Sequence, residues 1–173
     1  MKITRIVLPA ILFVMPLSLS AQLIYSSTTI DDLDFILGEW KGELQTFHPD
    51  DPSVFSAIPA SMEYRKIKNK KIIYEWKLTP PDGFPVRQKG NIEFKNGLLY
   101  FGDGYYELKE KRTTRGNDGT EWVFYRRAKE GKNKLLIKQT LSVEGSNLSL
   151  KKEIQLQGEF EYVRVSIYRM ERR

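Results

Sequence analysis

The chain has 173 residues, which allows one domain with a hydrophobic core of ordinary size, and it contains no cysteine. Disulfides, a lipid-attachment cysteine and thiolate metal sites are therefore excluded. Lysine and arginine number 28 against 22 acids, for a formal net charge of +6, and His48 is the only histidine. Cys–His catalysis is thus excluded, and a Ser-His-Asp triad would have to use His48.

Residues 1–21 have the layout of a secretory signal peptide. Lys2 and Arg5 precede an apolar run over 6–17, and small residues follow up to Ala21. This run is shorter than the roughly 20 residues that span a bilayer, although an N-terminal membrane anchor is the alternative. Cleavage after Ser20 or Ala21 would leave a mature chain with a formal charge of +4 and no transmembrane segment. We therefore expect a periplasmic or secreted bacterial protein.

The mature chain begins with a short predicted helix. Thr29 and Asp32 have the spacing of a capping box, and Leu33, Ile36 and Leu37 follow at helical spacing up to Gly38. After Gly38 the apolar residues recur at every second position, as in a strand, instead of at helical spacing. The sequence therefore predicts a helical turn that plugs one end of the domain, followed by strands.

Ten short strands are predicted after this turn. Apolar and polar residues alternate, and tight turns such as Pro80-Pro81-Asp82-Gly83 and Asn96-Gly97 separate the runs. The expected strands cover residues 39–46, 59–67, 72–78, 87–94, 98–101, 105–109, 121–125, 135–143, 148–156 and 159–170. Many short strands without a long helix indicate an antiparallel barrel or sandwich, and closure into a barrel would remove the exposed edges.

The run from Phe35 to Gly42 reads Phe-x-x-Gly-x-Trp-x-Gly at the start of the first strand. It resembles the opening of the lipocalin-like (calycin) β-barrels, and it is most similar to small bacterial barrels of the DUF1579/nitrobindin-like kind. The resemblance covers nearly all of residues 22–173. It implies an all-β, antiparallel up-and-down barrel of about 8–10 strands with a short N-terminal plug helix and an internal cavity. It does not identify a ligand.

Trp40 is the conspicuous residue of that motif. In lipocalin-like barrels a tryptophan here packs across the closed end, often under an arginine of the last strand. The resemblance makes Arg169 the expected partner of Trp40, with Arg172 as the second candidate. Stacking of a guanidinium on an indole contributes roughly 0.5–2 kcal/mol, so the pair is expected to be structural.

Three tryptophans, nine tyrosines and nine phenylalanines supply the barrel with aromatic side chains. Those in alternating strands that could point inward are Tyr74, Trp76, Tyr100, Trp122, Phe124 and Tyr162. They could line a pocket for a small apolar or amphipathic molecule, or they could fill the interior as an ordinary core.

Cofactor and catalytic sites find little support in the sequence. Nitrobindin-like proteins bind haem through a histidine near the chain end, whereas His48 lies in an acidic, proline-containing loop, so no cofactor is expected. Two-carboxylate chemistry would require Glu75 to converge with Glu93 or Glu107 inside the barrel. Gly102-Asp103-Gly104 lacks the regularly spaced acids of a calcium loop.

Basic residues gather in three clusters, at 66–71, 109–115 and 126–134. Their interleaving with aromatics is also found in single-strand nucleic-acid binders, but an export signal argues against that partner. The favoured prediction is an exported, non-catalytic barrel that binds a small hydrophobic or amphipathic ligand, entering opposite the Trp40 end. The alternatives are a filled barrel whose basic loops bind an anionic partner, and a barrel enzyme using carboxylates.

Overall fold

The computed structural model describes residues 28–48, 51, 53–113 and 119–173, which are mostly strand. The elements in order are η1 (Ile30–Ile36), β1 (Gly38–Phe47), β2 (Phe55–Ile67), η2 (Lys68–Lys70), β3 (Lys71–Leu78), β4 (Val86–Lys95), β5 (Leu98–Phe101), β6 (Tyr105–Thr113), β7 (Gly119–Glu130), β8 (Asn133–Glu144), β9 (Asn147–Leu156) and β10 (Val163–Arg172). The predicted signal peptide, residues 1–21, lies outside the described part of the chain.

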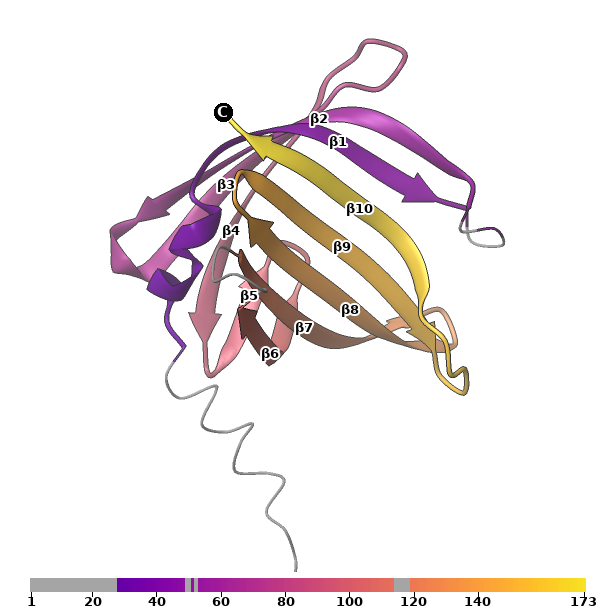
Figure 1. The fold of residues 1–173 in the computed structure, drawn as a ribbon. Coiled ribbons are helices and arrows are strands. Elements are labelled where there is room, and N and C mark those ends of the chain that lie inside the picture. Colours follow the sequence, from indigo (N-terminus) through magenta and orange to yellow (C-terminus); the bar gives the residue numbers. More distant parts are fainter. Residues whose placement is uncertain (1–27, 49–50, 52, 114–118) are drawn as a thin grey trace, which may run out of the picture.

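Each strand pairs antiparallel with its neighbours in sequence, and β10 returns to β1, which closes a barrel of ten strands (Figure 1). The predicted all-β, up-and-down antiparallel barrel is confirmed. A closed ten-stranded meander also fits the calycin type of barrel that the sequence resembles. Closure pairs the backbone groups of every strand edge except where neighbouring strands differ in length.

The alternating pattern decides which side chains fill the barrel. Along β8, Ile137, Leu141 and Val143 are buried, in the register that the apolar alternation predicts. The predicted Asn96-Gly97 hairpin also forms, because both residues take the positive φ angles, 52° and 77°, that a tight two-residue turn requires.

The last strand differs from the prediction. It begins at Val163 rather than residue 159, and its ladder with β9 is irregular between Arg164 and Ser166. Tyr168 and Met170 are buried in the barrel interior. A bulge of this kind changes which side chains face inward along one strand, and a strict period of two cannot reveal it.

The predicted plug is present as a 3₁₀ helix, η1. Its buried side chains are Ile30, Leu33 and Ile36, spaced three apart, as expected for three residues per turn. The Asp32 carboxylate accepts a hydrogen bond from the Thr29 backbone N–H at 2.8 Å, as the predicted capping box requires. Lys66 of β2 binds Asp31 at 2.6 Å and Asp34 at 2.8 Å, which ties η1 to the barrel wall.

The arginine over Trp40 is Arg172, not Arg169. The Arg172 guanidinium lies 4.6 Å from the Trp40 ring and donates to the Phe35 carbonyl at 2.9 Å, while Trp40 Nε1 donates to the Ile36 carbonyl at 2.8 Å. Both side chains thereby satisfy carbonyls at the end of η1. Arg169 is exposed on the outer face because it lies an odd number of positions from Arg172 on β10.

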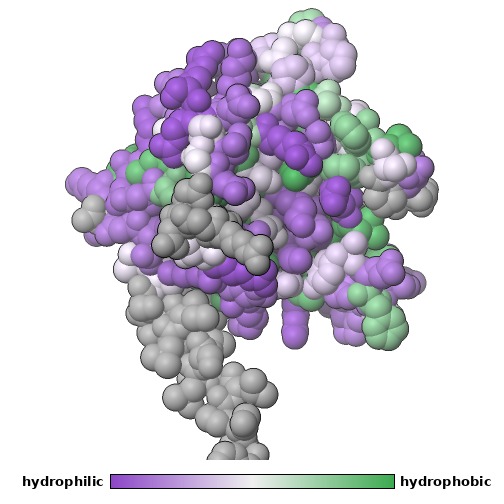
Figure 2. Space-filling view, in the orientation of Figure 1, coloured by the Kyte–Doolittle hydropathy of each residue, from purple (hydrophilic) through white to green (hydrophobic). Residues whose placement is uncertain are grey.

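The end of the barrel opposite η1 carries the exposed apolar side chains of three connections. They lie in these connections or at the strand ends beside them: Val54 and Phe55 at the β1–β2 connection, Phe84 and Val86 at the β3–β4 connection, and Leu156, Phe160 and Val163 at the β9–β10 connection. Figure 2 shows hydrophobic surface at the edge where these connections lie, beside a largely hydrophilic front. Within the described residues, neither helical segment has the length and apolar character needed to cross a membrane.

Candidate functional site

A cavity of about 200 Å³ lies inside the barrel, next to the packed core. Its residues come from six strands and one turn: Tyr74 and Trp76 on β3, Gln88 on β4, Phe101 on β5, Gly102 and Asp103 in the β5–β6 turn, Gln139 on β8, Leu150 and Lys152 on β9, and Ser166 and Tyr168 on β10. The barrel interior is therefore not completely filled. A cavity of about 150 Å³ accommodates benzene, so the space suits a molecule of one ring and a short substituent.

One side of the cavity is aromatic. Trp76 lies at its centre, stacked on Tyr74 at a centroid distance of 4.9 Å, with Tyr168 at 5.1 Å and Phe101 at 6.3 Å. The Trp76 Nε1–H is buried and makes no hydrogen bond among the described residues, although the Tyr64 hydroxyl is near. This wall can pack against a flat apolar group and still has one N–H donor.

Two glycines make room for the Tyr74 ring. A Cβ atom would lie 2.2 Å from the Tyr74 hydroxyl oxygen at Gly90 and 2.3 Å from it at Gly102. Any larger residue at either position would clash with the Tyr74 hydroxyl. The position of Tyr74 in the cavity wall therefore depends on both glycines.

The other side of the cavity is polar and centred on Asp103. The Asp103 carboxylate accepts hydrogen bonds from the Tyr106 hydroxyl at 2.9 Å and from Arg126 Nη2 at 2.9 Å. Arg126 also donates to the Asp103 carbonyl and stacks on the Tyr106 ring at 5.0 Å. Lys152 Nζ lies 3.8 Å from the same carboxylate. Gln139, which is 7% exposed, adds a buried amide.

The short length of β5 positions this polar side. The β4–β5 ladder covers only Ile92–Lys95 of β4, so the preceding residues of β4 have no ladder partner on that side. The β5–β6 turn, with Asp103, lies beside this unpaired part of the wall. Gln88 and Asp103 are exposed while they line the cavity, so the cavity reaches solvent here.

Burial raises the pKa of the tyrosines that surround the cavity. The pKa of Tyr168 rises to about 12, because the phenolate would be buried and would lie near Tyr74. The pKa values of Tyr74 and Tyr106 are also raised, first by burial; at Tyr106 the Asp103 carboxylate disfavours the phenolate as well. All three therefore stay neutral hydrogen-bonding groups at physiological pH.

The raised pKa of Tyr168 predicts a loss of stability in alkali. Above pH 10 the unfolded chain ionises this tyrosine and the folded barrel does not, so the stabilisation is complete below pH 10 and is lost up to about pH 12. Between pH 9 and 11 this residue should lower the free energy of unfolding by about 1.4 kcal/mol. Urea unfolding at pH 9 and at pH 11 measures this loss of stability. In Tyr168→Phe the difference between the two pH values should be smaller by about 1.4 kcal/mol. Equal pH dependence in the variant would contradict the assignment.

The six aromatics expected to bind a ligand fall into three groups. Tyr74 and Trp76 line the cavity. Trp122 and Phe124 are buried in the filled part of the barrel, and Trp122 packs 5.8 Å from Phe35 of η1. Tyr100 and Tyr162 are only partly buried: Tyr100 pairs with Tyr105 at 5.2 Å, and Tyr162 lies under Lys138 at 5.4 Å.

The other groups considered from the sequence do not converge on the cavity. Glu75, Glu93 and Glu107 occupy the outward register of their strands; Glu75 faces Lys89 at 3.1 Å, and that pairing lowers its pKa. His48 is exposed after β1 and does not line the cavity, so it does not fit a haem ligand. Haem also exceeds the size of this cavity.

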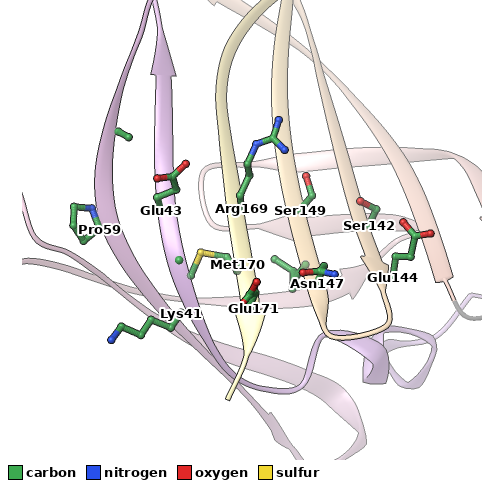
Figure 3. A pocket seen from close by; sticks show the side chains of 13 residues that line it. Lys41, Glu43, Pro59, Ser142, Glu144, Asn147, Ser149, Arg169, Met170 and Glu171 are labelled. Atoms are coloured by element: carbon green, nitrogen blue, oxygen red, sulfur yellow. The ribbon is translucent and has the colours of Figure 1, made fainter.

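A larger hollow of about 730 Å³ lies on the outer face of β1, β2, β8, β9 and β10 and is open to solvent (Figure 3). Four of its charged side chains lie in opposite-sign cross-strand pairs, Glu43 beside Arg169 and Lys41 beside Glu171, while Glu144 lies beside the uncharged Asn147. Cross-strand pairs of exposed charges contribute no more than about 0.5 kcal/mol each to the β1–β10 closure. The hollow contains no buried polar side chain, so the interior cavity is the stronger candidate site.

Several residues of the predicted basic clusters have acidic neighbours. Lys66 binds two acids of η1, and Lys111 binds Asp32 at 3.3 Å while lying 4.4 Å over the Trp122 ring. Arg112 pairs with Glu110 and with Glu121, and Arg126 is held by Asp103. These cations pair with acidic groups of the protein itself, which weakens the case for a surface that binds a large anionic partner.

Sequence reasoning missed the polar residues of the cavity, namely Gln88, Asp103, Gln139, Lys152 and Ser166. A signal existed for two of them. Gln139 and Lys152 interrupt otherwise apolar registers, Leu135–Ile137–x–Leu141–Val143 and Leu148–Leu150–x–Ile154–Leu156. A polar residue in an inward register is expensive to bury without a partner, so it indicates a site.

Comparisons with known proteins show similarity in fold only. No family model matches the chain, and no curated protein matches it. Among solved structures, it is similar to Rv2717c from M. tuberculosis, with 12% identity over 83% of this chain and 96% of that chain, and a TM-score of 0.48. It is also similar to the S-type phycobiliprotein lyase CPES from Guillardia theta, with 10% identity over 88% and 97% of the two chains, and a TM-score of 0.44.

Proposed function

We propose that this protein is an exported, non-catalytic binding protein that holds a small amphipathic molecule inside its barrel. The observation that carries the proposal is the cavity of about 200 Å³ with an aromatic wall facing a polar one. Binding sites are typically mostly apolar with a few convergent polar groups that orient the ligand. The small volume favours a compact, single-ring molecule over a long lipid or a tetrapyrrole.

The proposal of export rests on residues 1–21, whose basic start, apolar middle and small-residue end are typical of a signal peptide. A periplasmic or secreted location follows from it. The narrower resemblance to DUF1579/nitrobindin-like barrels rests on the Phe35–Gly42 motif and stays a prediction.

Filling the cavity should weaken binding. Ser166 lines the cavity, whereas Ser149 lies on the outer face of the neighbouring strand β9. Native mass spectrometry of the protein from its own envelope fraction should show a small molecule retained by the wild type and by Ser149→Leu. Ser166→Leu should lose at least about tenfold in affinity for it, because the added carbons occupy the ligand's space.

The same spectra test each part of the proposal separately. The mass of the protein itself shows whether residues 1–21 have been removed. A wild-type protein that carries no molecule, and that binds none of the single-ring compounds named below, would contradict the binding function. Equal retention by Ser166→Leu would place the ligand outside this cavity.

A further inference from the structure

The charged side chains at the cavity differ in how fully a neighbouring opposite charge neutralises them. Asp103 is held by two strong partners, the Tyr106 hydroxyl and the Arg126 guanidinium, each at 2.9 Å. The Arg126 guanidinium neutralises the Asp103 carboxylate that it binds, and its second donor, to the Asp103 carbonyl, fixes it in place.

Lys152 is in a different position. Its ion-pair distance to Asp103 is 3.8 Å, longer than a hydrogen bond, and the acid already has its own cation. Lys152 stands in the inward register of β9 between Leu150 and Ile154, and its side chain is 31% exposed. One cavity-facing positive charge is thus left without a full counter-ion among the described residues.

The side chains around Lys152 could contact the uncharged part of a ligand whose acid group pairs with the lysine. Gln139 is its ladder partner on β8 and Ser166 its ladder partner on β10, and both line the cavity. Beyond them lies the aromatic wall of Trp76 and Tyr168. A cation, two neutral polar groups and a flat apolar wall therefore meet within one small space.

We propose that the cavity binds a small aromatic monocarboxylate whose carboxylate pairs with Lys152 and whose ring packs against Trp76 and Tyr168. A single uncompensated ammonium matches one negative charge, whereas a phosphate dianion would lack a second cation, since Arg126 is engaged by Asp103. The volume of about 200 Å³ matches a ring with a one- or two-carbon acid group. This inference rests on the proposed function and adds the chemical class of its ligand.

The test compares acids with neutral molecules of the same shape. Benzoate and phenylacetate are titrated into the mature protein by calorimetry beside benzamide and phenylacetamide, with phenyl phosphate as the dianionic probe. The carboxylates should bind at least about tenfold more tightly than the amides, because a charge-assisted hydrogen bond contributes more than a neutral one.

Two variants of adjacent lysines locate the charge. Lys152→Met removes the ammonium but keeps an unbranched side chain only one atom shorter, and it leaves Asp103 with Tyr106 and Arg126, so the barrel should fold. It should weaken carboxylate binding at least about tenfold and leave amide binding within about twofold. Lys151→Met is the matched control, because Lys151 faces outward and pairs with Glu153 at 3.2 Å. It should bind the acids as the wild type does.

The outcomes separate the inference from the proposed function. If the amides bind as tightly as the acids, or if Lys152→Met binds the acids unchanged, the acidic ligand is wrong and the binding barrel stands. If phenyl phosphate binds best, the carboxylate assignment is overturned. If no compound of either series binds, the inference is wrong. If the wild-type protein also carries no molecule from its envelope fraction, the proposed binding function is contradicted as well.

Discussion

Gly42→Ala should lower the free energy of unfolding by about 3 kcal/mol, although it adds a single methyl group. A Cβ atom at Gly42 would lie 2.0 Å from the Arg169 carbonyl oxygen and 2.9 Å from the Met170 Cα, both of which are backbone atoms that cannot rotate away. Strands β1 and β10 would have to separate where the barrel closes. Urea unfolding followed by tryptophan fluorescence measures the loss.

Lys41→Ala is the matched control for this substitution. Lys41 is the adjacent residue on β1 and is exposed on the outer face, so its removal should change stability by no more than about 0.5 kcal/mol. If Gly42→Ala were as stable as the wild type, the close approach of β1 and β10 would be wrong.

Trp40→Ala should cost about 3–5 kcal/mol, a large part of the stability of an ordinary domain. The Trp40 side chain is 1% exposed, and its removal leaves a cavity under η1, an Ile36 carbonyl without its indole donor, and Arg172 without its ring. The same unfolding measurement applies. Trp40→Phe should recover most of the loss, because it keeps the packing and gives up the hydrogen bond.

Two of the three arginines of β10, Arg169 and Arg172, provide the control for that interpretation. Arg172→Met should cost about 1 kcal/mol, since it removes the stacked guanidinium and the hydrogen bond to the Phe35 carbonyl. Arg169→Met should be nearly neutral, because Arg169 is exposed on the outer face. The reverse order of the two losses would restore Arg169 as the residue that closes the barrel.

The aromatic residues show how far a period-two pattern can predict a site. Alternation on β3 correctly placed Tyr74 and Trp76 on the face that lines the cavity. It could not separate them from Trp122 and Phe124, which share the inward register but lie where η1 and the core fill the barrel. Whether an inward side chain meets a ligand or another side chain depends on packing from distant strands, which no local pattern contains.

The polar half of the cavity depended even more on tertiary structure. Asp103 and Arg126 are 23 positions apart in sequence, and Lys152 comes from a third element. Their meeting follows from the short β5, which brings the β5–β6 turn against the barrel interior. The apolar registers around Gln139 and Lys152 marked two of these residues in advance, but not their partners.

The sequence by itself determined the class of fold, the plug and the turns, because these follow from local periodicity, capping and the φ angles that glycine and asparagine accept. It also marked Gly42 and Trp40 without explaining them. Only the tertiary structure showed that the backbone of β10 lies too close to Gly42 for any side chain there, that Arg172 stacks on Trp40, and that a cavity lies beside Lys152. Each of these depends on register and distance between strands far apart in the chain, and the closing of the barrel sets both.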